Sequence, residues 1–260
     1  MSFISLRQIS RSFGSFTALR DVSLEINASE FISIIGPSGC GKSTLLQIIG
    51  GLLPPSGGEV RVKGKVIAAP PREIIYLFQQ YNRSLFPWRT VRRNVALGLE
   101  TLGLSRRDID EKCAEYIKLV GLAGFENYLP HQLSGGMQQR VAVARALACG
   151  PNVILMDEPF GSVDAQTRAG LQDLLLRLWQ EYRITILFVT HDIDEAIYVA
   201  QKVLVLSAAP GRIRTSMPTD LGYPRHQIRT REISRYLEHR RHLYSLIFPE
   251  GVESEAVSAA

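Results

Sequence analysis

The sequence contains no apolar run long enough to cross a bilayer. A membrane-spanning helix needs roughly 20 consecutive apolar residues, whereas the longest runs here, at residues 31–35, 153–156 and 184–189, have the length of strands. The first residues (Met-Ser-Phe-Ile-Ser-Leu-Arg-Gln) also lack the apolar stretch of a secretory signal peptide. We therefore expect a protein that stays in the cytoplasm and does not itself cross a membrane.

Cysteine and excess charge are also scarce. Cys40, Cys113 and Cys149 are far apart, without the spacing of a metal site, which suits a reducing compartment. The net charge of +5 is too modest to indicate nucleic-acid binding by itself. No segment is repetitive or of low complexity. A chain of 260 residues, 45% of them apolar, can bury a full α/β core.

A glycine-rich loop gives the strongest positive signal. It reads Gly36, Pro37, Ser38, Gly39, Cys40, Gly41, Lys42, Ser43 and Thr44, the pattern of a P-loop. An apolar, β-branched run at residues 31–35 precedes it, and helically spaced apolar residues follow up to residue 50. Glycines in such a loop let backbone N–H groups converge on phosphate oxygens at a helix N-terminus. The structural alternative is a glycine turn that only begins a helix.

Two residues of the loop have side chains suited to phosphate and metal. Lys42 is expected to neutralise the β- and γ-phosphates of a nucleoside triphosphate, and the Ser43 hydroxyl to hold Mg²⁺. Cys40 is expected to be a small filler, although its thiol would make nucleotide binding sensitive to thiol reagents. The loop therefore predicts binding of a nucleoside triphosphate with Mg²⁺.

Two carboxylates follow the apolar strand at residues 153–156. Parallel sheets bind ligands at the carboxyl ends of their strands, so Asp157 suits the Mg²⁺ shell. Glu158 points to the other side of the strand, where it can reach a water in line with the γ-phosphate. The alternative is an acidic turn after a strand. After a P-loop, we expect Glu158 to act as the general base.

Two further segments begin helices. Residues 133–140 read Leu-Ser-Gly-Gly-Met-Gln-Gln-Arg, in which Ser134 suits an N-cap. Gly135 and Gly136 lower helix propensity, which indicates close approach of a ligand or of another backbone, with an anion as the natural candidate. Asp164 precedes an amphipathic helix and is also a candidate N-cap.

With these motifs in this order, the chain resembles the nucleotide-binding subunit of an ATP-binding cassette (ABC) transporter, over residues 4 to about 213. The resemblance implies an α/β fold: a P-loop NTPase (RecA-like) core with a parallel sheet, an antiparallel β subdomain and an α-helical signature-motif subdomain. The antiparallel strands are expected in residues 1–30 and about 57–68. Helices are expected at 91–102, at 107–120 and after Ser134, within an insertion at about 82–150.

The resemblance also assigns roles to individual residues. It implies that Gln79, or the adjacent Gln80, senses Mg²⁺ and the attacking water. It implies that His191, at a strand end, contacts the γ-phosphate, although a lone histidine there is more often bonded to backbone. Phe13, with Phe16 as the alternative, is implied to stack on adenine.

The remaining roles belong to an assembly of two subunits. Ser134, Gly135 and Gly136 are implied to bind the ATP of the opposite subunit in a head-to-tail homodimer. Asp164, with residues 162 and 163, matches the D-loop, a role compatible with an N-cap.

The resemblance implies ATP and Mg²⁺ as cofactors and a separate transmembrane permease as partner. An external substrate-binding protein is an indirect partner, and the chain is expected on the cytoplasmic side of the membrane as a peripheral subunit. Phe86-Pro87-Trp88 is either a buried loop anchor or an exposed contact for the permease. An ABC-type ATPase acting on nucleic acid is the alternative class, but such relatives carry long coiled coils or two cassettes in one chain, so no nucleic-acid partner is expected.

Within the transporters, three stretches are similar to the nitrate/sulfonate/taurine importer group. They are Ser-Leu-Phe-Pro-Trp-Arg-Thr-Val, Asp-Glu-Pro-Phe-Gly-Ser-Val-Asp-Ala-Gln-Thr-Arg and Ser-Ala-Ala-Pro-Gly-Arg-Ile. We expect the ATPase domain at residues 1–220 and a basic helical tail at 221–260. The tail either packs on the core or contacts anionic headgroups or the permease, with residues 252–260 disordered.

Overall fold

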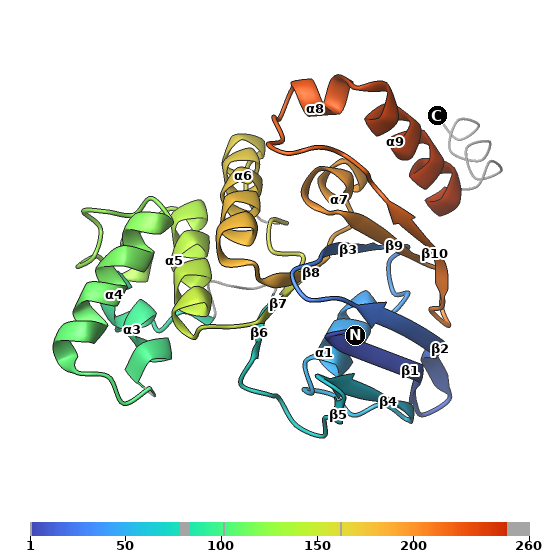
Figure 1. Cartoon of the computed structure of the whole chain (residues 1–260), viewed down its shortest axis with the longest axis horizontal. Coiled ribbons are helices and arrows are strands. Elements are labelled where there is room, and N and C mark those ends of the chain that lie inside the picture. The colour runs from blue at the N-terminus through green and yellow to red at the C-terminus, as the bar shows by residue number, and fades with distance from the viewer. Residues whose placement is uncertain (1, 79–83, 101, 162, 249–260) are drawn as a thin grey trace. The chain divides into compact units, whose positions relative to one another are not determined.

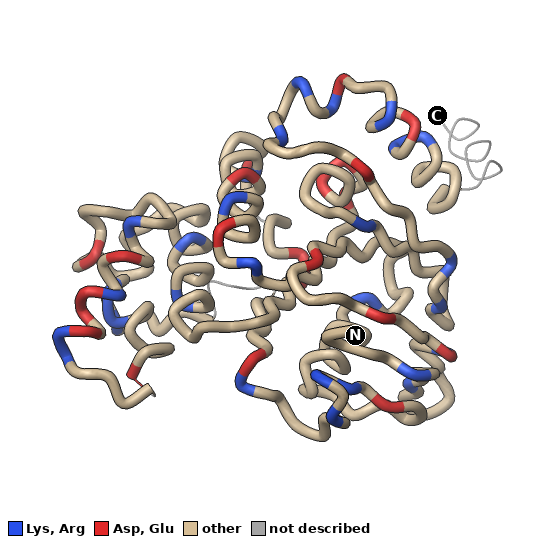
Figure 2. The backbone as a smooth tube through the Cα atoms, in the orientation of Figure 1, with Lys and Arg blue, Asp and Glu red and all other residues tan. Residues whose placement is uncertain are grey.

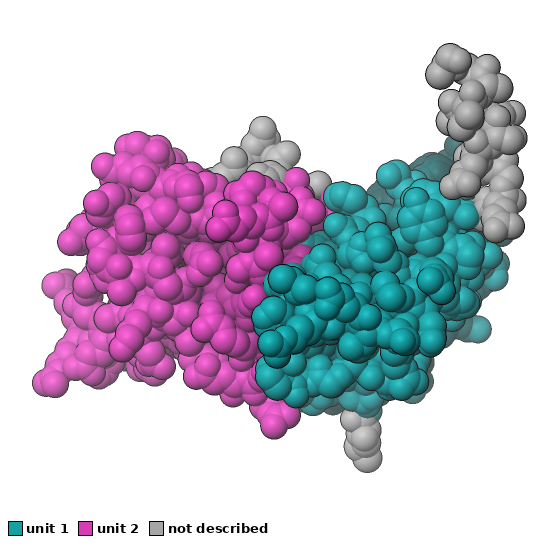
Figure 3. Space-filling view, turned by 90° about the horizontal axis from the view of Figure 1, so that it is seen from above, with its two compact units in different colours: residues 1–68, 188–260 teal, residues 69–187 magenta. Residues whose placement is uncertain are grey.

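The computed structural model describes residues 2–78, 84–100, 102–161 and 163–248 (Figure 1). The chain divides into two compact units, residues 1–68 with 188–260 and residues 69–187, coloured separately in Figure 3. Among the described helices, none combines the length and the apolar character required to traverse a bilayer.

The first unit contains the expected antiparallel sheet. Its strands are β1 (Ile4–Phe13), β2 (Phe16–Ile26), β4 (Gly57–Val62) and β5 (Lys65–Val66), in the order β2-β1-β4-β5. β1 pairs antiparallel with both β2 and β4, with shifts of register in its middle. Ile4, Leu6 and Ile9 of β1 are buried, and the register shift between Leu6 and Ile9 interrupts the alternation of a regular strand.

The same unit holds the strand and helix on either side of the glycine-rich loop. β3 (Phe31–Ile35) is buried throughout and pairs in parallel with β9 (Lys202–Leu206), which pairs antiparallel with β10 (Ile213–Pro218). α1 (Lys42–Ile49) follows the loop, and α7 (Ile193–Val199) follows β8 (Thr185–Val189). β8 begins in the second unit and ends in the first, where the N–H of Thr190 donates to the Ile34 carbonyl (3.2 Å).

The second unit contains two parallel strands and most of the helices. β6 (Ile74–Leu77) pairs in parallel with β7 (Val153–Asp157). The helices are α3 (Val91–Glu100), α4 (Arg106–Leu119), the 3₁₀ helix η1 (Pro130–Gln132), α5 (Gly135–Ala148) and α6 (Ala165–Tyr182). α3 ends two residues earlier than predicted, and Ser105 begins α4 by accepting a hydrogen bond from the Asp108 N–H. The signature helix is confirmed.

The basic tail is part of the first unit. It forms α8 (Arg229–Glu232) and the predicted amphipathic helix, α9 (Ser234–Ile247), and arginines recur along both (Figure 2). Tyr236 and Leu243 of α9 are buried, and the Tyr236 hydroxyl donates to the Asp194 carbonyl at 2.8 Å. Arg225 donates to the carbonyl oxygens of Ile197 and Tyr198, near the end of α7. The expected disorder of residues 252–260 lies outside the described residues.

If α9 completes the core of its unit, its buried leucine should contribute far more stability than its exposed tyrosine. We predict that Leu243→Ala lowers the free energy of unfolding by about 2–5 kcal/mol, because it leaves a cavity among apolar neighbours. Tyr244→Ala, one residue further along, removes a larger but exposed side chain and should change it by less than about 0.5 kcal/mol. Urea unfolding of both variants measures the difference; equal losses would show that α9 is not a core element.

Candidate nucleotide site

The loop between β3 and α1 requires glycine for two reasons. Gly39 and Gly41 have φ angles of +74° and +97°, a region that side chains disfavour. A Cβ on Gly41 would also lie 2.8 Å from Leu19 Cδ2 and 3.0 Å from the Ala18 carbonyl oxygen. The predicted tight turn is therefore confirmed in its geometry.

α1 begins in a way that suits an anion. Its N-cap is Gly41, no side chain among the described residues caps it, and its first turn holds no acidic residue. α9 also lacks a side-chain cap, but its N-cap residue is not a glycine. By contrast, the side chains of Ser134, Asp164 and Asp192 accept hydrogen bonds at the starts of α5, α6 and α7. The N-terminal amides of a helix, together with its dipole, favour a phosphate group. The loop thus supplies the backbone part of a phosphate site.

Lys42 holds its charge against the same loop. Its side chain is largely buried (residue 8% exposed), and the ammonium donates to the carbonyl oxygens of Gly36 (2.8 Å) and Pro37 (3.0 Å). An ammonium has three donors and no acceptor. The cation therefore lies within the glycine-rich loop, as the sequence predicts, with two donors on loop carbonyls.

The turn between β9 and β10 packs against the glycine-rich loop, a contact that sequence analysis missed. The Gly211 N–H donates to the Ala18 carbonyl (2.8 Å), and its carbonyl accepts from the Arg20 N–H (3.0 Å). A Cβ on Gly211 would lie 2.1 Å from the Cys40 carbonyl oxygen, so glycine is required there. In the sequence, Gly211 stood out only as part of the stretch Ser-Ala-Ala-Pro-Gly-Arg-Ile, which is similar to an importer group.

His191 follows β8 at the position predicted for it. Thr190 is buried, donates to Glu195 (2.5 Å) and accepts from the Asp192 N–H (3.1 Å), which fixes the turn around His191. The Thr190 N–H bonds the Ile34 carbonyl, at the end of the strand that leads into the glycine-rich loop. His191 is exposed and therefore accessible to a bound phosphate.

Both candidate adenine-stacking residues are at the tip of the β1–β2 hairpin. Phe13 and Phe16 pair across the two strands and are 46% and 52% exposed. The Arg11 guanidinium lies 4.6 Å from the centroid of the Phe13 ring, a cation–π distance. Phe13 therefore remains the residue predicted to stack on adenine, with Phe16 as the alternative.

The second unit holds the predicted acidic pair. Asp157 is the last residue of β7, one residue beyond the predicted strand, and it is nearly buried. The Tyr76 hydroxyl donates to Asp157 Oδ2 at 3.0 Å, a partner that the sequence did not reveal. Glu158 has a φ of +43°, a backbone conformation that is uncommon for residues with a side chain. Residues in such conformations are concentrated at functional sites.

Each of the two units contains an oxygen donor of the kind that binds a magnesium ion. Mg²⁺ takes oxygen ligands, keeps several waters and needs only one or two protein carboxylates besides phosphate oxygens. Asp157 and the Ser43 hydroxyl are donors of this kind, and the described residues contain no cluster of three or more His, Cys, Asp or Glu side chains that would suit another metal. The predicted Mg²⁺ ligand Gln79, its alternative Gln80 and residue 162 of the D-loop lie outside the described residues.

The signature and D-loop segments meet in the second unit. Ser134 Oγ accepts from the Met137 N–H (3.3 Å), and Asp164 Oδ1 accepts from the Thr167 N–H (2.9 Å), so both predicted N-caps are confirmed. Hydrogen bonding to Thr167 lowers the pKa of Asp164. A Cβ on Gly136 would lie 2.3 Å from Thr167 Cγ2. The close neighbour of Gly136 in the described structure is therefore a side chain of α6, whereas the sequence suggested a ligand or another backbone; Gly135 is exposed.

The thiol of Cys40 should react slowly. Cys40 is fully buried, and burial raises the pKa of its thiol, so little thiolate forms near neutral pH. Burial raises the pKa of the Cys149 thiol as well, but this residue is only half-buried, so a reagent reaches its sulfur more easily. We predict that iodoacetamide at pH 7.5 alkylates Cys149 at least about tenfold faster than Cys40 and leaves nucleotide affinity unchanged.

Peptide mapping of the alkylated protein measures both rates, and Cys149→Ser controls for the faster site. Raising the pH toward the elevated pKa of Cys40 should speed its labelling. Rapid loss of nucleotide binding at pH 7.5 would contradict the prediction.

Comparison with known proteins places this geometry in a family. The sequence model described as "ABC transporter" matches residues 19–161. An ATP-binding protein of Brucella abortus is 50% identical over 222 residues, 85% of each chain. An aliphatic sulfonates import ATP-binding protein of Bacillus cereus is 43% identical over 226 residues, covering 85% of this chain and 88% of its own.

Solved structures agree. The dimeric structure of MJ0796, a bacterial ABC transporter cassette, has a TM-score of 0.73 at 36% identity and covers 83% of this chain and 98% of its own. A post-hydrolysis structure of that cassette, bound to ADP and Pi, gives a TM-score of 0.72 at 35% identity, with the same coverage. The expected fold class is thereby confirmed. A family model that spans more than half of the chain, and a relative that is 50% identical over 85% of it, show that this ATPase belongs to the ABC transporter family.

Proposed function

We propose that the chain hydrolyses ATP to drive an importer of small organic anions of the aliphatic sulfonate type. The observation that carries the ATP part is the glycine-rich loop, with Lys42 inside it and α1 beginning without a side-chain cap. The similarity to an aliphatic sulfonates import protein supports the class of cargo. Residues of this chain would not touch the cargo, so the cargo rests on similarity alone.

In the proposed reaction, the loop amides and Lys42 bind the β- and γ-phosphates, and the Phe13 ring stacks on adenine. Ser43 and Asp157 would hold Mg²⁺, with Gln79, which lies outside the described residues, as the further predicted ligand; the ion would supply positive charge to the phosphate oxygens. Glu158 accepts a proton from water while the water oxygen bonds the γ-phosphorus and the bond to the β–γ bridging oxygen breaks. His191 stabilises the charge on the γ-phosphate, and ADP and phosphate leave.

The proposed active form is a head-to-tail homodimer. The N-terminus of α5, with exposed Ser134 and Gly135, would bind the γ-phosphate held by the opposite subunit, since a helix N-terminus favours an anion. The dimeric state of the similar MJ0796 cassette supports this arrangement. Closure on two ATP molecules would then drive the permease, and hydrolysis would reopen the dimer.

The loop at residues 86–90 is the proposed contact for the permease, on the cytoplasmic face of the membrane. Trp88 is 71% exposed, so the predicted alternative of a buried loop anchor is wrong for Trp88. Buried Asn94 accepts from the Phe86 N–H (2.9 Å) and donates to the carbonyl oxygens of Phe86, Arg89 and Thr90. The loop is thus held rigidly by one side chain, and a rigid exposed tryptophan is a typical interface anchor.

Substituting Glu158 separates catalysis from binding. We predict that Glu158→Gln lowers kcat for ATP about 10²–10⁴-fold while the affinity for Mg·ATP stays within twofold, because only proton transfer is lost. It should also accumulate an ATP-bound dimer, visible by size-exclusion chromatography.

Lys42→Ala is the contrasting variant. It removes the cation that binds phosphate, so it should weaken the affinity for Mg·ATP itself by about tenfold or more. Turnover of Glu158→Gln within tenfold of the unmodified chain would show that Glu158 is not the base.

The transport assignment is tested by purification of the tagged chain from membranes in mild detergent. We expect a polytopic membrane protein to co-purify and to stimulate ATP hydrolysis. Trp88→Ala should reduce its recovery at least about tenfold, whereas Tyr244→Ala, an exposed aromatic on α9, should not. Recovery of nucleic acid, or of a soluble complex without a membrane protein, would refute the proposal.

A further inference from the structure

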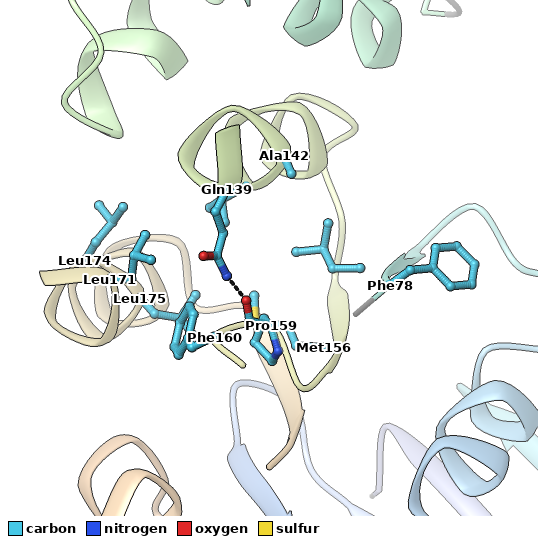
Figure 4. A pocket seen from close by; sticks show the side chains of 11 residues that line it. Phe78, Gln139, Ala142, Met156, Pro159, Phe160, Leu171, Leu174 and Leu175 are labelled. Carbon is cyan, nitrogen blue, oxygen red and sulfur yellow. Dashed lines mark hydrogen bonds between the residues drawn. The ribbon is translucent and has the colours of Figure 1, made fainter. Parts of the chain in front are cut away.

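A buried amide on the signature helix bonds the backbone next to the proposed catalytic base. Gln139 of α5 is 2% exposed, and its Nε2 donates to the carbonyl oxygen of Pro159, the residue after Glu158 (Figure 4). Gln139 and Pro159 both belong to the second unit. The contact therefore joins α5, which begins at Ser134, to the turn that follows β7.

The surroundings of this amide are apolar. Figure 4 shows the Gln139 side chain directed from α5 toward Pro159, in a pocket whose other lining residues include Met156, Phe160, Leu171 and Leu175. Its Oε1 is buried and has no hydrogen-bond partner among the described residues. An unpaired buried acceptor is costly, and an apolar side chain of the same length would leave none. Gln139 is thus a poor choice for packing alone.

The backbone that Gln139 bonds is itself in an unusual conformation. Glu158 has its φ of +43° in the left-handed region, which persists only where neighbouring contacts hold it. The Gly161 N–H donates to the Glu158 carbonyl (3.3 Å), and Gln139 bonds the next carbonyl along. These two hydrogen bonds restrain successive carbonyl groups at the proposed catalytic turn.

We propose that Gln139 is a positioning residue that holds the Glu158–Pro159 turn in its catalytic conformation and links it to the signature helix. The proposal rests on the proposed role of Glu158 as general base. Any displacement of α5 when Ser134 binds an anion would reach the Pro159 carbonyl through Gln139, five residues further along the same helix.

The test compares Gln139→Leu and Gln139→Met with Leu171→Met, in the full chain under conditions where the unmodified protein turns over. Leucine and methionine remove the donor and the unpaired acceptor but keep the volume. Leu171→Met alters the same pocket without touching the Pro159 carbonyl. The measurements are kcat, the affinity for Mg·ATP and the midpoint of thermal unfolding.

We expect both Gln139 variants to lose at least fivefold in kcat, with affinity for Mg·ATP within twofold and an unfolding midpoint no lower than that of the unmodified chain. Leu171→Met should retain its kcat. A kcat loss below fivefold would overturn the proposal, as would an equal loss in Leu171→Met or a lowered midpoint, since these indicate a structural role.

Failure of this inference is separable from failure of the proposed function. If Glu158→Gln abolishes turnover while the Gln139 variants keep it, only the positioning role is wrong. If Glu158→Gln keeps turnover, the assignment of the base is wrong, and the positioning role fails with it.

Discussion

The partner of each helix N-terminus is the constraint on which this structure depends. The first amides of a helix need acceptors. At α5, α6 and α7 the side chains of Ser134, Asp164 and Asp192 supply them. Within the described part of the chain, α1 and α9 begin without a side-chain cap, and α1 differs from α9 in beginning at a left-handed glycine. The first turn of α1 also lacks an acidic residue, and Lys42 beside it is buried. Both features suit a helix N-terminus that binds an anion. α1 is suited to an acceptor that comes from outside the protein.

The second unit organises its chemistry around one helix. α5 carries Ser134 at its start, contacts α6 closely at Gly136, and bonds the turn after β7 through Gln139. Since a helix transmits displacement along its axis better than a loop does, the parts that would bind a neighbouring subunit and the parts that would activate water share a rigid element. The Gly136 contact leaves no room for a further side chain between α5 and α6 at this point.

The sequence predicted features that depend on a local pattern. The glycines at 39 and 41, the caps at Ser134 and Asp164, and the strand that ends at Asp157 each have a signature within a few residues. The bonds from Tyr76 to Asp157 and from Gln139 to Pro159 join residues 81 and 20 positions apart. They depend on strand order and helix packing, which leave no local pattern. Gly136 illustrates both cases: the sequence predicted a close approach at this glycine, but it did not predict that the neighbour is Thr167 of α6.

The burial of Lys42 determines when its ammonium loses water. A cation on a flexible surface chain would shed its hydration shell as the ligand arrived, and the affinity would be reduced by that dehydration. In this protein Lys42 is only 8% exposed, and its ammonium is solvated by two carbonyl oxygens of its own loop. The dehydration therefore belongs to the folding of the protein. When a nucleotide binds, the Lys42 ammonium would exchange carbonyl oxygens of the loop for phosphate oxygens. The preference of Lys42 for a ligand would then depend on how much better its oxygens accept hydrogen bonds than the loop carbonyls do.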